Sequence, residues 1–378
     1  MIKYNFNPSL ITMAQVYAFV SNRGGAGKSS LVSQVAPALA LRNPGKQVLL
    51  LDLSIQGDAS VITLGGTGAP RDLVPGIRTR GAEVIAALPN EKRSLAFVNN
   101  AVMAATPPVF MGGWGVLGRA VTPANLGSGR AHLTSGFEWQ KHAVRVRDAH
   151  PAGNAPENLW ISPGGRALYT AFPASEVLTT AASLRTAFTA MGPNVLVVID
   201  TDAELAERTS SLIGISASRS LCMVLTSSWT DYQRLLDDAA NGFFAGLTWL
   251  AERDPASAAK ISLVVFNNVQ LLNKNKSGVG GTMLPFTPPR AALDAIGDIS
   301  NHLYSMGTAP TTNYKQFFSD PAVFGSHHAF VERYVTGFST VPTTVWQDCQ
   351  ARGVPVVCAA GEGAKGPAAQ IEELVARM

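Results

Sequence analysis

Cysteine is scarce in this chain of 378 residues, which holds three isolated cysteines, at positions 222, 349 and 358. Their isolation argues against a disulfide framework and favours a reducing compartment. No Cys-x-x-Cys pair occurs, and the six histidines show no tight spacing of the kind that binds a metal. We interpret the pair His327-His328 as surface residues, so the sequence predicts no histidine or cysteine metal site.

Long apolar runs are also missing. No stretch is long enough to span a bilayer, and the first twelve residues lack the apolar core of a secretion signal. Met13 could serve as an alternative start. We therefore expect a cytoplasmic protein that makes no contact with membranes.

Hydrophobic residues are plentiful at 46%, enough for a substantial core in one large or two medium domains. Apolar runs of strand length alternate with stretches of helical periodicity. This alternation predicts an α/β fold with a mostly parallel sheet and helices on both faces.

The most informative segment is 16–30, in which an apolar strand pattern ends in a glycine-rich turn and a helical pattern follows. This order is typical of a phosphate-binding loop, in which glycines let backbone N–H groups approach phosphate and the helix offers its positive end. Lys28 would contact the terminal phosphates, and the Ser29 hydroxyl would ligate Mg²⁺. The predicted nucleotide-binding residues here are Gly24, Gly25, Ala26, Gly27, Lys28, Ser29 and Ser30.

The segment Arg23-Gly-Gly-Ala-Gly-Lys-Ser29 resembles the deviant Walker A loop of the ParA/MinD family, which reads Lys-Gly-Gly-x-Gly-Lys-Thr/Ser. The resemblance implies a P-loop ATPase that uses ATP and Mg²⁺ to dimerise and to position DNA or other cargo. In that family the first lysine reaches the partner's nucleotide across a dimer interface. This chain has Arg23 there, which keeps the charge and can grip phosphate with two donors, although the two residues differ in reach.

A second segment, Asp52-Leu-Ser-Ile-Gln-Gly-Asp58, is similar to the family's switch segment Asp-x-Asp-Pro-Gln-Gly-Asn. Asp52 matches, but the aspartate that activates the attacking water in the family is Ser54 here. A hydroxyl is a poor base at neutral pH, and a positioned general base is worth about 10²–10⁴ in rate. We expect slow hydrolysis, with Asp58 or Asp202 as substitutes for the base or, alternatively, as helix caps or turn residues.

The apolar run 194–200 resembles the family's Walker B strand because it ends in Asp200-Thr201. An aspartate at the carboxyl end of a strand beside a phosphate loop can hold Mg²⁺ and its waters. The candidate metal ligands are Ser29, Asp52 and Asp200. The residues expected in catalysis are Arg23, Lys28, Asp52, Ser54, Asp58 and Asp202.

The resemblance continues more weakly towards the C-terminus. Two further buried strands are expected at 221–226 and 261–266, and Asn267 after the second is the candidate for recognising adenine, although tandem asparagines are also common in turns. Pro342 would belong to the family's late proline-containing loop. A final strand is expected within 352–357 and a last helix over 368–377.

We divide the chain into an N-terminal extension, 1–13, and one ParA-like domain, 14–378, with insertions at about 71–156 and 272–327. Residues 71–147 carry ten Lys or Arg against four acids, a net charge of +6 that exceeds the whole chain's +4. The first insertion could bind DNA or another polyanion, or it could be a solvated segment with scattered cations. The second could be a surface loop or a contact arm.

Two function classes remain open. The favoured one is a ParA-like switch that forms a homodimer with ATP, binds DNA or other cargo, and releases it after slow hydrolysis stimulated by a partner protein. Such a protein would be cytoplasmic or nucleoid-associated. The alternative is a structural or regulatory protein that binds ATP but has lost turnover, as Ser54 would allow. The absence of Cys-x-x-Cys counts against the related iron–sulfur carriers, and the C-terminus lacks the basic amphipathic tail by which MinD-like members bind membranes.

Overall fold

The computed structural model has one sheet of eight strands in the order β3-β4-β2-β5-β1-β6-β7-β8. It describes residues 13–21, 24–68, 79–105, 137–150, 155–168, 172–202, 209–236, 242–254, 257, 259–269, 290–310, 312, 314–339, 345, 349, 351–359 and 362–378. Neighbouring strands are parallel except for β3, which runs antiparallel to β4. The strands are β1 Gln15–Val20, β2 Gln47–Asp52, β3 Val144–Arg145, β4 Leu159–Ser162, β5 Val195–Asp200, β6 Ser220–Leu225, β7 Lys260–Val269 and β8 Val335–Ser339.

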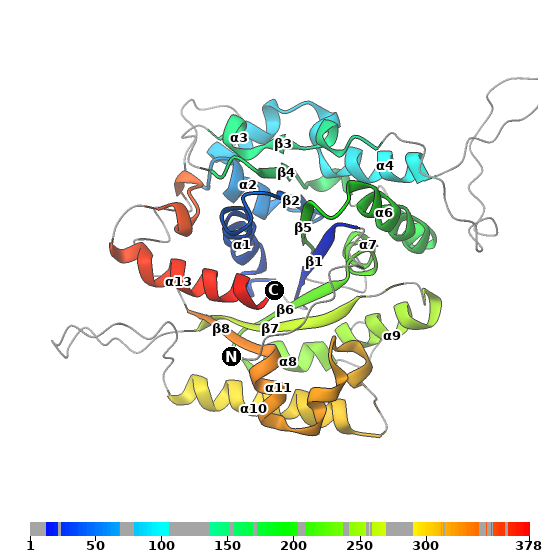
Figure 1. Cartoon of the computed structure of the whole chain (residues 1–378), viewed down its shortest axis with the longest axis vertical. Helices are drawn as coiled ribbons and strands as arrows, with labels where there is room; N and C mark the ends of the chain where they lie inside the picture. The colour runs from blue at the N-terminus through cyan, green and yellow to red at the C-terminus, as the bar shows by residue number, and fades with distance from the viewer. Residues whose placement is uncertain are drawn as a thin grey trace, which may run out of the picture.

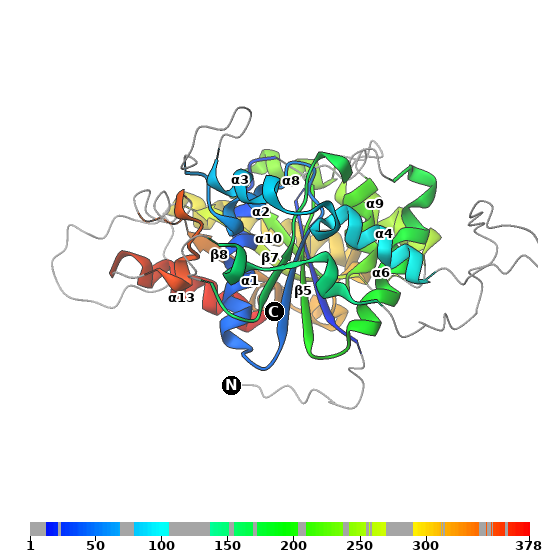
Figure 2. The ribbon, with the colours of Figure 1, turned by 90° about the horizontal axis from the view of Figure 1, so that it is seen from above.

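Helices cover both faces of this sheet, so the predicted fold class is confirmed (Figure 1). They are α1 Lys28–Arg42, α2 Asp58–Leu64, α3 Arg80–Ala87, α4 Ser94–Ala105, α5 Val146–Ala149, α6 Val177–Met191, α7 Thr209–Ala217, α8 Trp229–Leu236, α9 Phe243–Arg253, α10 Arg290–Thr308, α11 His327–Tyr334 and α13 Glu362–Arg377. Figure 2 shows the central strands running between these layers.

The central strands are continuous apolar runs because each is buried on both faces. Alternate residues of β2 face opposite sides: Leu49 packs into one core and Leu50 into the other. The first core contains side chains from α4 and α6 to α11, and the second contains side chains from α1, α2, α5 and α13. Burial on two faces is what a parallel sheet of this composition requires.

One expectation about the C-terminal half is wrong. Within 352–357 the described residues form no strand; Val356–Cys358 is a short 3₁₀ helix, and the outermost strand is instead β8. Pro355 precedes that 3₁₀ helix, and proline has no N–H to donate to a strand ladder. For the second insertion the sequence left a surface loop and a contact arm open; its described part includes α10, which buries Ile299 and Leu303 in the core. The predicted last helix is confirmed as α13.

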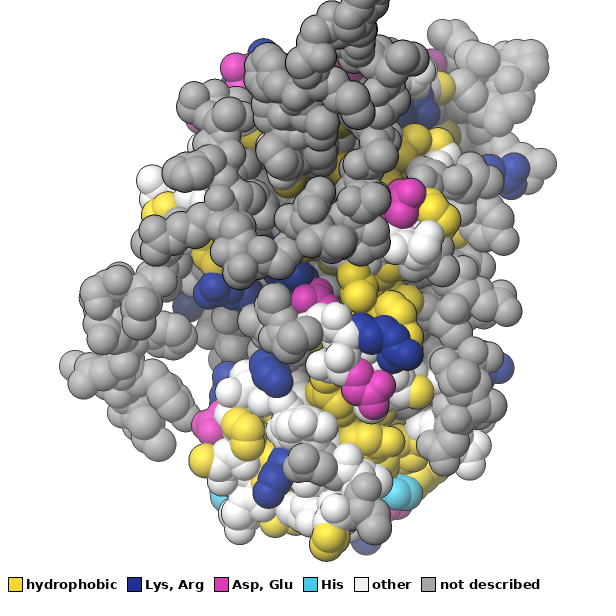
Figure 3. Space-filling model, turned by 90° about the vertical axis from the view of Figure 1, so that its right-hand side faces the viewer, with side chains coloured by type: hydrophobic (Ala, Val, Ile, Leu, Met, Phe, Trp, Pro, Cys, Tyr) yellow, Lys and Arg dark blue, Asp and Glu magenta, His cyan; other side chains and the backbone are white. Residues whose placement is uncertain are grey.

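The first insertion supplies α3, α4, β3 and α5 among the described residues. Two of its basic side chains interact with neighbouring residues. Arg147 forms an ion pair with Glu157, and the Arg145 guanidinium lies 5.1 Å from the centre of the Trp160 ring. On the face shown in Figure 3, Lys and Arg side chains occur in several separate places among hydrophobic and uncharged ones. The division of the chain into an extension, a domain and two insertions stays a prediction.

Among the residues that the structure describes, no helix is both long and apolar enough to cross a membrane.

Candidate functional site

The candidate site lies at the carboxyl edge of the sheet, where β1, β2 and β5 end side by side. Phe19 of β1 is paired with Asp200 of β5, and Asp52 of β2 is paired with the same Asp200. In open α/β sheets, ligands bind at this edge because the loops that leave the strands converge there. The register therefore brings two carboxylates from distant parts of the chain next to the loop that follows β1.

The loop after β1 has the backbone of a phosphate-binding turn. Gly25 and Gly27 have φ of 87° and 74°, in the left-handed region that residues with a side chain rarely adopt. Gly27 occupies the N-cap of α1, which begins at Lys28, and no side chain caps the helix. The first N–H groups of α1 therefore remain to receive an anion. Ser29 and Ser30 are half-buried in its first turn.

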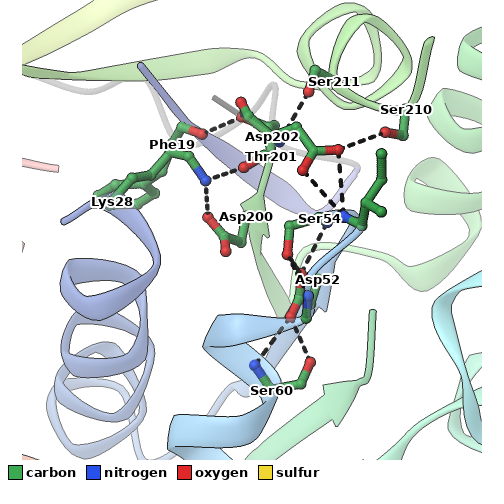
Figure 4. A network of polar contacts seen from close by, with 12 residues as sticks. Phe19, Lys28, Asp52, Ser54, Ser60, Asp200, Thr201, Asp202, Ser210 and Ser211 are labelled. Atoms are coloured by element: carbon green, nitrogen blue, oxygen red, sulfur yellow. Dashed lines mark hydrogen bonds and ion pairs between the residues drawn. The ribbon is translucent and has the colours of Figure 1, made fainter. Parts of the chain in front are cut away.

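Lys28 is buried at this edge, with an exposed fraction of 6%. Its Nζ donates to Asp200 Oδ1 at 2.5 Å and also contacts the carbonyl oxygen of Thr201 (Figure 4). The Thr201 hydroxyl donates to the Phe19 carbonyl at 2.7 Å, which ties β5 to β1 directly before the loop. A buried ammonium needs such partners, since removing a charge from water costs several kcal/mol.

Asp52 is fully buried and accepts four hydrogen bonds. Its Oδ1 accepts from the Ser54 amide at 2.9 Å and the Ser54 hydroxyl at 2.6 Å, and its Oδ2 accepts from the Ser60 amide at 3.0 Å and the Ser60 hydroxyl at 2.6 Å. Burial, and then the nearby charge of Asp200, raise the pKa of Asp52 from 3.8 to about 6, although the serine hydrogen bonds oppose this shift.

The architecture around this site has known counterparts. No protein-family model and no curated protein sequence matches the chain. Among solved structures, pNOB8 ParA aligns with a TM-score of 0.53 at 11% identity over 97% of both chains. The apo McdA of Cyanothece aligns with a TM-score of 0.52 at 11% identity over 95% of this chain and 98% of that one. This chain has the ParA fold.

Hydrogen bonds fix the switch segment, residues 52–58 after β2, both within the segment and to the residue that follows Thr201. Ser54 Oγ accepts from the Gly57 amide at 3.1 Å while it donates to Asp52, so the hydroxyl shapes a turn. Asp202 accepts from the Ile55 amide at 3.1 Å and from the Ser210 hydroxyl at 3.3 Å. Asp202 thus links the switch segment to α7.

Asp58 differs from these carboxylates because it is exposed, in the first turn of α2. Its pKa is raised by partial burial and by the charge of Asp200, while Lys28 opposes the shift. Of the two predicted substitutes for the missing aspartate, Asp58 is thus the one in contact with solvent. The role of either as a base stays a prediction.

The donor set suits a hard divalent cation. Asp200 Oδ2 is a buried oxygen with no hydrogen-bond partner in the described part of the chain, whereas Oδ1 of the same carboxylate binds Lys28. The half-buried Ser29 lies next to Lys28 in the first turn of α1. Asp52 is less suited to bind the cation directly, because serine donors already occupy both of its oxygens.

Asn267, predicted to recognise adenine, is buried at the carboxyl edge in β7. Its Nδ2 donates to the Ala26 carbonyl at 2.8 Å, so it contacts the phosphate loop itself. A role towards adenine stays a prediction. Arg23 and Pro342 lie outside the described residues. Arg23 is the residue that would mark the deviant form of the loop, so that form stays a prediction.

Sequence reasoning missed Gly164, in the loop after β4. Its amide donates to the Ser60 hydroxyl at 3.1 Å, and a Cβ built at this position would lie 2.7 Å from Asp52 Oδ1. Only glycine allows this approach without displacement of the carboxylate. The sequence signal was the pair Gly164-Gly165 after an apolar run, but nothing in it indicated that the pair would face Asp52.

The raised pKa of Asp52 predicts a pH dependence of stability. A carboxyl group with a higher pKa in the folded than in the unfolded state binds its proton more tightly when folded. Its stabilising contribution is complete below about pH 4 and is lost as the pH rises to about 6. We expect this group to lower the free energy of unfolding by about 3 kcal/mol across that window, from the cited pKa shift.

Urea unfolding between pH 4 and pH 7 measures this slope. Asp52→Asn removes the titrating group, so the decline should flatten, with a remainder from Asp58, whose pKa is also raised. The exposed Asp148 provides the control, since Asp148→Asn should keep the wild-type slope. An unchanged slope in Asp52→Asn would contradict the assignment.

Proposed function

We propose that this protein is an ATP-dependent, dimerising switch of the ParA/MinD type that positions or partitions DNA or other cargo and hydrolyses ATP slowly. The observation that carries the proposal is the buried Lys28, at the start of α1 and paired with Asp200 at the end of β5. In these places the lysine would contact the phosphates of a nucleoside triphosphate, and the aspartate would hold its magnesium ion.

The loop backbone, Lys28, Ser29 and Asp200 would each have a defined role in the proposed complex. The N–H groups around Gly25 and Gly27 and the first turn of α1 would bind phosphate oxygens, and Lys28 would neutralise the terminal phosphates. Ser29 and Asp200 would hold Mg²⁺, whose charge neutralises phosphate oxygens when it is bound.

Slow turnover is supported by the polar contacts of the switch segment. Ser54 occupies the position of the family's activating aspartate. Its hydroxyl donates to Asp52 and accepts from the Gly57 amide. Asp202 accepts hydrogen bonds from the Ile55 amide and the Ser210 hydroxyl. Asp58 is the remaining carboxylate, and its raised pKa makes it a better base than an ordinary aspartate.

The same contacts favour a second candidate, an ATP-binding structural or regulatory protein without turnover. Both candidates would bind ATP, and the second would not hydrolyse it. A steady-state phosphate-release assay, run with and without DNA, separates them. Release above the level of the Lys28→Ala variant identifies an ATPase, whereas release at that level under all conditions identifies the second candidate.

The phosphate loop is tested by Lys28→Ala. Loss of a charged donor should weaken ATP binding by about 1.5–3 kcal/mol, which calorimetry resolves as roughly a tenfold to hundredfold rise in Kd. Lys46 is a suitable control because it lies at the opposite edge of the sheet, where its Nζ donates to Gln15 at 3.3 Å. Lys46→Ala should bind ATP like the wild type, and an unchanged affinity in Lys28→Ala would refute the assignment.

Dimerisation is tested through Arg23, which would contact the partner's nucleotide if it acts like the lysine at that position in the ParA/MinD family. Arg23→Ala should abolish the dimer formed with a non-hydrolysable ATP analogue while it leaves ATP binding by the monomer largely intact. Arg23→Lys, which restores the family's residue, should still dimerise. Light scattering with ADP and with the analogue measures both, and a normal dimer in Arg23→Ala would rule out a role in trans.

Turnover is tested by Ser54→Asp, which returns a carboxylate to the switch segment. If the remaining geometry is competent, the hydrolysis rate should rise by about 10²–10⁴, the usual worth of a general base. Ser54→Asn has nearly the same shape without the charge and should not raise the rate. Brisk wild-type hydrolysis that survives both Asp58→Asn and Asp202→Asn would overturn this account of the site.

A further inference from the structure

Asp202 is a buried carboxylate whose presence the phosphate and metal contacts do not explain. It lies two residues after Asp200 at the carboxyl edge of the sheet and is 5% exposed. Its Oδ1 and Oδ2 accept from the Ile55 amide at 3.1 Å and 3.3 Å, and Oδ2 also accepts from the Ser210 hydroxyl at 3.3 Å (Figure 4). A buried charge is costly unless hydrogen bonds compensate it, so these donors are what allows a carboxylate here.

The backbone that carries Asp202 is fixed on several sides. The Asp202 amide donates to the Ser211 hydroxyl of α7 at 2.9 Å. The carbonyl of the same peptide unit, that of Thr201, is contacted by Lys28 Nζ, and the Thr201 hydroxyl donates to the Phe19 carbonyl at 2.7 Å. The Asp202 carboxylate therefore projects from a peptide that is bonded to α1 and α7, next to a residue bonded to β1. A side chain on such a rigid support can hold another segment in place.

The segment that Asp202 contacts is the switch segment, directly after Ser54. The amides of Ser54 and Gly57 have their acceptors inside the segment, on Asp52 and on the Ser54 hydroxyl. The Ile55 amide differs, because its acceptor Asp202 lies 147 residues further along the chain. This long-range hydrogen bond fixes the backbone beside position 54 relative to the end of β5 and the start of α7.

On the basis of the proposed ATPase function, we propose that Asp202 is a positioning residue for hydrolysis. It holds Ile55, and with it position 54, at the carboxyl edge of the sheet, and it does not take the proton of the attacking water. A base needs a carboxylate, whereas positioning needs only hydrogen-bond partners. Asp202→Asn separates the two roles, because it keeps an oxygen for the Ile55 amide and offers an N–H to the Ser210 hydroxyl but cannot accept a proton at neutral pH.

The first test measures amide hydrogen exchange of residues 53–58 by mass spectrometry in the absence of nucleotide, so it does not depend on ATPase activity. Asp202→Ala removes the acceptor of the Ile55 amide, and exchange in this segment should become about tenfold faster, the equivalent of one charged hydrogen bond. Asp202→Asn should exchange nearly like the wild type. If Asp202→Ala does not fold, Asp202→Ser replaces it, since its hydroxyl ends one bond short of the carboxylate oxygens.

The second test measures steady-state phosphate release and ATP affinity in the same variants. Asp202→Asn should keep the wild-type kcat, whereas Asp202→Ala should lower kcat by about tenfold to hundredfold, the usual effect of a small misplacement. The Kd for ATP should change by less than about threefold in both, because Lys28 is untouched. If no protein, wild type included, releases phosphate above the Lys28→Ala level, the proposed ATPase fails, and the exchange measurement still decides whether Asp202 holds the segment.

Asp254 provides the matched control, because it is a second buried aspartate that contacts the opposite end of α7. It accepts from the hydroxyl of Ser216 at 2.7 Å in the last turn of that helix, whereas Ser210 lies in the first turn. Asp254→Asn should change neither the exchange of residues 53–58 nor phosphate release. Unchanged exchange in Asp202→Ala, or an equal loss of kcat in Asp202→Asn and Asp202→Ala, would overturn the proposal.

Discussion

The buried ion pair between Lys28 and Asp200 is the constraint around which the rest of the site is arranged. Lys28 is 6% exposed and Asp200 is fully buried, so neither charge is tolerable without the other. The pair joins the first residue of α1 to the last residue of β5, and the Thr201 hydroxyl bonded to Phe19 fixes β1 in the same register. The phosphate loop is thereby held between two central strands, with its first helical N–H groups aimed at the edge where ligands bind.

Asp52 lies at the same edge, where hydrogen bonds enclose it. Ser54 and Ser60 each donate two hydrogen bonds to Asp52, one from the hydroxyl and one from the backbone amide. The Gly164 amide, in the loop after β4 and more than a hundred residues away in the chain, donates to the Ser60 hydroxyl. A carboxylate so enclosed orders the backbone around it, and its raised pKa reflects burial beside Asp200.

The parts of the site that local sequence could predict are those coded within a few residues. The glycines around Lys28, the apolar runs that end in Asp52 and Asp200, and the periodicity of the last helix each predicted their element, and the structure has them. The strand expected near Val356 failed because a short apolar run beside proline suits a 3₁₀ turn as well as a strand. α10 was missed because the sequence before it is rich in glycine and proline, which masked the helical pattern that begins at Arg290.

By itself, the sequence determined the layered α/β architecture and the glycine-rich loop between β1 and α1, because hydrophobic period and glycine spacing act over one or two turns of chain. Tertiary structure alone decided what the other polar residues do. In the folded chain Asn267 donates to the Ala26 carbonyl, and Gly164 packs against Asp52. Ser54 and Asp202 accept hydrogen bonds from amides of the switch segment. These contacts join residues far apart in the chain, and their pairing depends on strand order and register, which local patterns do not encode.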